Sequence, residues 1–138
     1  MNEKRLEELA VSLGTPSYVF DTDILKKRAD WAAKHLRPAG LCFAIKANPF
    51  LVGALEAHVD RYEVCSPGEF HICVQNGLPA DKIVLSGVNK EYEDVLYAMK
   101  HGVVHYTAES KSQCYLVERC AEELGKQVEI LLRVTSGN

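Results

Sequence analysis

The sequence lacks several features that would each point to a class of function. It contains no glycine-rich phosphate loop, of either the dinucleotide or the P-loop kind, and no proline-rich linker or low-complexity tract. Lysines and arginines are interleaved with acidic residues and the net charge is −3, so no basic stripe is available for nucleic acid or an anionic membrane. The charged residues Glu3, Lys4, Arg5, Glu7 and Glu8 argue against a signal peptide or a spanning segment at positions 1–13. We therefore expect a cytoplasmic protein with no nucleic-acid or membrane partner.

Cysteine and histidine also show no metal-binding pattern. The five cysteines are odd in number and include no C-x-x-C pair, which predicts free thiols rather than a zinc or dithiol site. Cys65 is expected to pack rather than to react. The five histidines share no ligand spacing, and only His105 falls on a predicted strand near the presumed site. No metal is expected.

What is present suffices for one globular domain. The chain has 138 residues, of which 47% are hydrophobic, enough for a core of ordinary size. Residues 1–13 show helical spacing of apolar positions and precede Gly14, a residue typical of helix ends. Residues Ser17–Phe20 are predicted as a strand, and Asp21 or Thr22 as the cap of a second helix.

From residue 41 onward a short β-rich run, a loop and an amphipathic helix recur in turn. Strands are predicted at Leu41–Lys46, Arg61–Cys65, Lys82–Ser86, Val103–Tyr106 and Val128–Val134, and helices from near Phe50, Pro67, Glu91 and Ser110. Such alternation is typical of a parallel sheet covered by helices. Strand starts recur about every 20–25 residues, the spacing of a barrel unit. We predict an α/β fold, namely an incomplete TIM-type (β/α) barrel of about five consecutive parallel units with a leading helix and strand. An open flavodoxin-like sheet is the alternative, and the order of the strands in the sheet distinguishes the two folds.

The first of these strands is apolar until its last residue, Lys46. The active sites of barrels lie at the carboxyl ends of the strands, so a reacting group is expected here. Desolvation at the edge of an apolar interior favours the neutral amine, the form that attacks an aldehyde. Lys46 is therefore a candidate for imine chemistry, and a lysine that merely reaches from a strand end into water is the alternative.

Several segments resemble, in family order, the diaminopimelate, ornithine and arginine decarboxylases, which belong with alanine racemase to fold type III of the pyridoxal-phosphate enzymes. Phe43-Ala44-Ile45-Lys46-Ala47-Asn48 is similar to their aromatic-Ala-Val/Ile-Lys-Ala-Asn signature. Residues 15–21 are similar to the family's entry segment. The resemblance continues through residues 63–69, 83–90 and 131–134, and so covers nearly the whole chain.

This resemblance implies that Lys46 is the catalytic lysine, which forms the internal aldimine with pyridoxal 5'-phosphate until a substrate amine displaces it. The cofactor then stabilises a carbanion at the α-carbon of an amino-acid substrate, while the protein determines which bond breaks. Loss of the carboxylate defines a decarboxylase, a lyase, and loss of the α-proton defines a racemase. The prediction is a decarboxylase most like diaminopimelate decarboxylase, and a racemase of the same fold type is the alternative.

The resemblance also implies four further cofactor-binding residues. Glu63 stands where the family usually has an aspartate beside the cofactor. Ser66 begins a Ser-x-x-Glu capping box and could face the cofactor as well. Ser86 replaces a histidine common in diaminopimelate decarboxylases, which puts any ring contact in doubt, and Arg133 matches a family arginine near the cofactor. The departures at Glu63 and Ser86 leave open a non-catalytic, pyridoxal-phosphate-binding or regulatory protein.

Barrels commonly bind phosphate through the loops after the seventh and eighth strands, and this sequence shows about five units. By the resemblance, residues 1–138 are the N-terminal part of a pyridoxal-phosphate-binding (β/α)8 barrel domain, and the C-terminal β-domain is absent. The fragment alone is therefore expected to be inactive. Because an open sheet edge favours pairing with another chain, a homodimer is expected.

Overall fold

The computed structural model describes residues 2–134, with the backbone alone at Ala47. The helices and strands follow in the order α1 (Glu3–Leu13), α2 (Thr22–Leu36), β1 (Cys42–Ala44), α3 (Val52–Leu55), β2 (Arg61–Val64), α4 (Pro67–Gln75), β3 (Ile83–Leu85), α5 (Tyr92–Lys100), β4 (His105–Ala108), α6 (Lys111–Leu124) and β5 (Glu129–Leu132). Short 3-10 helices lie at η1 (Ile45–Ala47), η2 (Pro49–Leu51) and η3 (Ala80–Lys82). The predicted alternation of strand and helix is therefore found from β1 onward.

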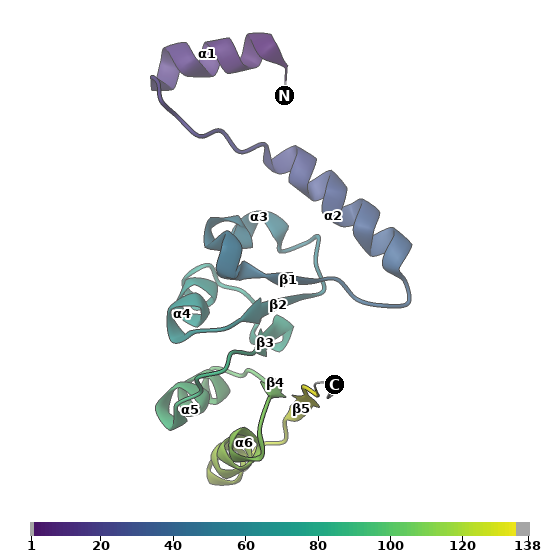
Figure 1. Cartoon of the computed structure of the whole chain (residues 1–138), viewed down its shortest axis with the longest axis vertical. Helices are drawn as coiled ribbons and strands as arrows, with labels where there is room; N and C mark the ends of the chain where they lie inside the picture. The colour runs from purple at the N-terminus through teal and green to yellow at the C-terminus, as the bar shows by residue number, and fades with distance from the viewer. Residues whose placement is uncertain (1, 135–138) are drawn as a thin grey trace, which may run out of the picture.

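The five strands form one parallel sheet whose spatial order, β1-β2-β3-β4-β5, is the order of the chain. Helices α4, α5 and α6 follow one another along the sheet (Figure 1). A sequential order contains no point at which the strand order reverses, so the flavodoxin-like alternative is wrong. The predicted α/β architecture, an incomplete TIM-type barrel of five parallel units, is confirmed.

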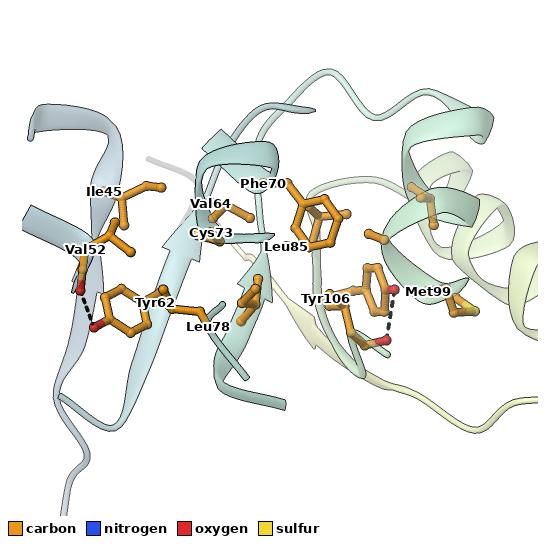
Figure 2. Packing of buried hydrophobic residues seen from close by; sticks show 14 of the residues in the cluster. Ile45, Val52, Tyr62, Val64, Phe70, Cys73, Leu78, Leu85, Met99 and Tyr106 are labelled. Carbon is orange, nitrogen blue, oxygen red and sulfur yellow. Dashed lines mark hydrogen bonds between the residues drawn. The ribbon is translucent and has the colours of Figure 1, made fainter. Parts of the chain in front are cut away.

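The core lies between the sheet and its helices. On β2, Tyr62 and Val64 are buried while Arg61 and Glu63 are half-buried, because successive side chains of a strand point to opposite faces. The buried residues of the strands pack against apolar side chains of the helices, among them Phe70 of α4 (Figure 2). The opposite face of the sheet carries charged side chains, such as Arg61 and Glu63, together with apolar ones, such as Val84 and Leu131.

Two buried tyrosines keep their hydroxyl groups hydrogen-bonded. The Tyr62 hydroxyl donates to the Val52 carbonyl at 3.0 Å, and the Tyr106 hydroxyl donates to the Val103 carbonyl at 3.1 Å (Figure 2). Burial raises the pKa of Tyr62 to about 12. A ring of this kind buries about 150–250 Å², and the bond to a carbonyl removes the cost of hiding a hydroxyl. Tyr62 therefore ties β2 to α3 as well as filling the core.

The predicted leading helix is confirmed as α1, and the predicted cap of the second helix is Asp21. Its carboxylate accepts hydrogen bonds from the amides of Asp23 at 3.1 Å and Ile24 at 3.2 Å. The leading strand predicted at Ser17–Phe20 is wrong, since the structure assigns no strand to these residues. A strand needs a partner for its backbone groups, and this segment runs clear of the sheet with Tyr18 fully exposed (Figure 1).

Helices α1 and α2 contribute little to the core. α1 has no buried residue, and Ala29 is the one buried residue of α2. Trp31, the only tryptophan of the chain, is 55% exposed, and its ring stacks on that of His35 with the centroids 4.3 Å apart. The hydrophobic cluster is therefore built mainly from β1 onward.

Four of the five strands end earlier than predicted, whereas β4 ends at Ala108, two residues later than the predicted end at Tyr106. β1 ends at Ala44, and Lys46 lies in η1, where the amide of Asn48 donates to the Ile45 carbonyl at 3.0 Å. Because this tight turn lifts the chain out of the sheet, Lys46 is exposed and does not end a buried strand, as the sequence had predicted. Ser86 likewise lies one residue beyond β3.

Candidate active site

All five strands are parallel, so their carboxyl ends open on one face of the domain. We call this the carboxyl-end face and define it by Lys46, Cys65, Ser86, Thr107 and Arg133. Four of these residues lie just beyond the strands that position them, and Thr107 lies within β4. Ser86 and Thr107 follow directly on the paired residues of β3 and β4, which brings their side chains side by side.

Lys46 lies at the β1 end of this face. Its side chain is exposed, so the desolvation expected from the sequence is not found. Among residues 2–134, none accepts a hydrogen bond from its ammonium group. The positive charge of Lys46 is near enough to Cys65 to affect the ionisation of that thiol. An accessible amine beside a polar strand end can react with a carbonyl compound.

Cys65 lies where several of the predicted residues meet. Burial raises the pKa of its thiol, and the negative charges of Glu63 and Glu69 raise it further. The charge of Lys46 and a hydrogen bond with Ser86 lower the pKa, but the net shift is upward. The thiol is therefore neutral at ordinary pH, which suits packing rather than nucleophilic attack. The charges of Glu63 and Lys46 and the hydrogen bond with Ser86 therefore all act on this one thiol.

Ser86 is held against its neighbours by the turn that follows β3. Its side chain is nearly buried, and its Oγ accepts a hydrogen bond from Thr107 Oγ1 at 3.1 Å. The next residue, Gly87, has φ +95°, and a Cβ there would lie 2.5 Å from the Cys65 carbonyl oxygen. Only glycine allows this turn to pack directly on the backbone that follows β2.

Glu63 lies two residues before Cys65 on β2, on the face of the sheet away from the helices. It is half-buried and lines a hollow of about 480 Å³ together with Arg61, His105 and Glu129. The Nδ1 atom of His105 lies 2.8 Å from a Glu129 carboxylate oxygen, but the geometry is not that of a hydrogen bond. His105 therefore faces Glu129 within the hollow, two residues before Thr107 along β4.

Ser66 has a structural role that the sequence predicts. Its Oγ accepts a hydrogen bond from the amide of Glu69 at 3.3 Å, and Glu69 Oε2 accepts one from the amide of Cys65 at 2.8 Å. The capping box is confirmed, with one difference from the usual pattern. The Glu69 carboxylate accepts from the amide of Cys65, the residue before the cap, rather than from the amide of Ser66 itself. Ser66 lines a separate hollow of about 410 Å³ between α4 and α5, so the structure does not bring it into the hollow of Glu63.

Arg133 follows β5 at the far end of the carboxyl-end face. Its backbone amide donates to the Ala108 carbonyl at 2.8 Å, which extends the pairing with β4 by one residue. Its side chain is 70% exposed, and Nη1 lies 3.1 Å from an oxygen of Glu109, whose side chain is 23% exposed. The guanidinium group is therefore accessible but anchored at one side.

Neither a metal site nor a membrane span is found in the part of the chain that the structure describes. Within residues 2–134, no three histidine, cysteine or acidic side chains are arranged to bind a metal ion. No helix in the same range combines the length and the apolar character needed to cross a membrane.

Sequence analysis missed Thr107 and Gln113. Thr107 could have been found by aligning the ends of the predicted strands, because it stands beside Ser86 in the register. Gln113 could have been found as the last residue of a second capping-box pattern that begins at Ser110, since glutamine serves as well as glutamate in such boxes. Its side chain contacts both neighbouring turns of the carboxyl-end face.

The chain is similar to curated and solved decarboxylases. It is 35% identical over 136 residues to diaminopimelate decarboxylase of Zymomonas mobilis, covering 94% of this chain and 32% of that protein. With the enzyme of the same name from Aquifex aeolicus it shares 32% identity over 131 residues, covering 94% of this chain and 31% of the relative. The chain thus spans about a third of the length of these relatives.

Solved structures agree with this similarity. Diaminopimelate decarboxylase of Helicobacter pylori, complexed with L-lysine, superposes with a TM-score of 0.76 at 27% identity, covering 94% of this chain and 34% of that one. For the fold alone, lysine/ornithine decarboxylase of Vibrio vulnificus gives a TM-score of 0.81 at 20% identity, covering 95% of this chain and 36% of that one. The family described as "Pyridoxal-dependent decarboxylase, pyridoxal binding domain" matches residues 22–138. The chain therefore belongs to the pyridoxal-dependent decarboxylases, whose cofactor is pyridoxal phosphate, and the greater part of it is their pyridoxal binding domain.

Proposed function

We propose that the full-length protein is a pyridoxal-phosphate-dependent amino-acid decarboxylase of the diaminopimelate decarboxylase type, and that Lys46 attaches the cofactor covalently. The observation that carries the proposal is the position of Lys46, an exposed lysine on the turn after β1, at the end of a parallel sheet where barrel active sites lie. The similarity to two diaminopimelate decarboxylases supports the reaction type.

The carboxyl-end face fits the aldehyde end of this cofactor. The Lys46 amine is open to solvent, and the neutral Cys65 thiol and the Ser86–Thr107 hydroxyl pair lie toward the next strands. Gly87 keeps the turn after β3 free of a side chain. When bound, pyridoxal phosphate supplies an electron sink for the charge that develops at the α-carbon of an amino acid.

We assign the remaining roles to charged residues near this face. Glu63 would pair with the Lys46 ammonium group whenever the lysine is free, since both side chains act on Cys65. Arg133, anchored by Glu109, would offer its open guanidinium edge to an anionic group bound at the face. Ser66 would cap α4 and contact the cofactor from the turn after β2.

Borohydride trapping tests the attachment site. Reduction of the full-length gene product with pyridoxal phosphate should fix one cofactor group on Lys46, located by peptide mapping, and Lys46→Ala should abolish both the adduct and its absorbance. Lys82→Ala is a matched control, because Lys82 also lies in a three-residue 3-10 helix, but at the amino end of β3. An unchanged adduct in Lys46→Ala would sink the assignment.

Product analysis separates the candidate reactions. A decarboxylase releases carbon dioxide from diaminopimelate, whereas a racemase inverts an amino acid without releasing it. The departures at Glu63 and Ser86 favour a second candidate, a non-catalytic pyridoxal-phosphate-binding or regulatory protein. That protein would form the adduct at Lys46 and show neither reaction with any amino acid tested.

We also propose that residues 1–138 form the N-terminal part of a (β/α)8 barrel, that turnover needs the remainder of the barrel and a C-terminal β-domain, and that the whole protein is a cytoplasmic homodimer. Support comes from the share of the relatives that the chain covers and from the edge positions of β1 and β5 in the described sheet. Sedimentation of the full-length gene product should show a dimer, and a clean monomer at high concentration would contradict this.

A further inference from the structure

The side chain of Gln113 joins two neighbouring turns of the carboxyl-end face. Its Nε2 donates to the Val88 carbonyl in the turn after β3 at 2.8 Å. Its Oε1 accepts a hydrogen bond from the amide of Glu109, in the turn after β4, at 2.9 Å. Both ends of the amide are therefore used, and only one orientation of the group satisfies both partners. Gln113 also belongs to a capping box, since its own amide donates to Ser110 Oγ at 3.3 Å.

Lys90 also contributes to the junction between these two turns, the turn after β3 and the turn after β4. Its Nζ donates to the Gly87 carbonyl at 2.5 Å and to Gln113 Oε1 at 3.4 Å. The side chain is half-buried, and burial lowers the pKa of the ammonium group although the charge of Glu109 acts to raise it. The ammonium group thus points into the junction between the two turns rather than into water.

We propose that Gln113 and Lys90 are positioning residues of the cofactor site. They join the turn after β3, which carries Ser86, to the turn after β4, which carries Glu109. Because Glu109 holds Arg133 at 3.1 Å, the junction also fixes the guanidinium group at the far end of the face. Gln113 and Lys90 act on the cofactor through Ser86 and Arg133, and they do not touch it themselves. The inference rests on the proposed function, since it requires Lys46 to take up pyridoxal phosphate.

Four variants of the full-length gene product test this. Gln113→Leu removes both hydrogen bonds of the side-chain amide, and Lys90→Met removes the ammonium group while keeping an unbranched apolar chain of nearly the same length. Lys126→Met is the matched control, because Lys126 Nζ also donates to a backbone carbonyl, that of Met99 near the end of α5, in a part-buried hydrogen bond of 2.6 Å. Lys126 lies before β5, at the opposite end of the sheet. Lys90→Arg should restore part of the function because it returns a donor to the junction.

Two measurements are made on each variant, well below its unfolding midpoint. Absorbance titration with pyridoxal phosphate should show affinity weakened by about fivefold or more in Gln113→Leu and Lys90→Met, a typical strength of coupling between linked sites. Affinity should be unchanged in Lys126→Met. Hydrogen exchange of the cofactor-free protein should be faster at the Glu109 amide in Gln113→Leu, because that amide has lost its acceptor.

The outcomes separate this inference from the proposed function. If the unmodified protein forms no adduct at Lys46, both are overturned together. If it forms the adduct and the two junction variants bind pyridoxal phosphate with unchanged affinity, this inference alone is overturned. Equal weakening in Lys126→Met would also overturn it, because the effect would then come from a general loss of stability.

Discussion

Replacing Gly87 by alanine tests how closely the turn after β3 packs on the chain that follows β2. Gly87 has φ +95°, and the added methyl would lie 2.5 Å from the carbonyl oxygen of Cys65. Gly102 has φ +96°, but a methyl there would meet nothing nearer than the Ala80 Cβ at 3.4 Å. The two substitutions therefore impose the same backbone strain, and only Gly87→Ala adds a steric clash.

The difference in stability follows from these two terms. A positive φ costs an L-residue roughly 1–2 kcal/mol, which both variants bear. Overpacking adds about 1–3 kcal/mol, and here the contact is a backbone oxygen that cannot rotate away. We expect the free energy of unfolding to fall by about 1–2 kcal/mol in Gly102→Ala and by about 2–5 kcal/mol in Gly87→Ala. The larger loss is a substantial part of the roughly 5–15 kcal/mol that stabilises a domain.

Urea unfolding followed by far-ultraviolet circular dichroism measures both losses of stability. The two values are comparable if the free energy of unfolding falls with urea concentration at the same slope in both variants. Gly87→Ala should also weaken pyridoxal-phosphate binding, because the displaced turn carries Ser86, while Gly102→Ala should not. Equal losses of stability in the two variants would refute the close contact between Gly87 and Cys65.

Ser66→Ala and Ser110→Ala each remove a helix cap with the same 3.3 Å bond, and each should lower the free energy of unfolding by about 1 kcal/mol. Ser66→Ala should also weaken pyridoxal-phosphate binding in a titration, and an unchanged affinity would remove Ser66 from the site. Tyr62→Phe leaves the Val52 carbonyl buried without its donor and should cost about 1–2 kcal/mol in urea unfolding, which an unchanged midpoint would contradict. Burial raises the pKa of Cys73 from its ordinary 9.0 to about 11, so folding favours the protonated thiol. Its contribution is therefore complete below about pH 9 and is lost as the pH rises from about 9 to about 11, by roughly 2–3 kcal/mol. Cys73→Ala should show a shallower loss of the free energy of unfolding over that range.

The sheet could be predicted because its sequence signals are strong. Each strand from β1 onward is short and lies between helices with clear starts, such as those capped by Ser66 and Ser110. The failed prediction, a strand at Ser17–Phe20, rested on β-forming residues alone. Such residues favour a strand only where a neighbouring strand and a packed face are available. Local sequence does not encode that neighbour.

The site was predicted only in part, because several of its contacts also depend on neighbours that are distant in the sequence. Lys46 stands out because it is a charged residue at the end of a predicted apolar strand, but its exposure depends on the 3-10 turn, which the sequence pattern did not indicate. The contacts of Ser86 with Thr107 and of Arg133 with Glu109 join residues at the ends of neighbouring strands and depend on the register of those strands. Spacing along the chain cannot supply that register.

The position of Trp31 determines what intrinsic fluorescence can report on this protein. Its indole is already largely solvated in the folded state, on a helix with a single buried residue, so loss of the sheet would change its emission little. The near-ultraviolet signal of Tyr62 and Tyr106 would instead follow the core, because both rings are fully buried. A difference between the two signals during unfolding would measure how independently α2 detaches from the rest of the domain.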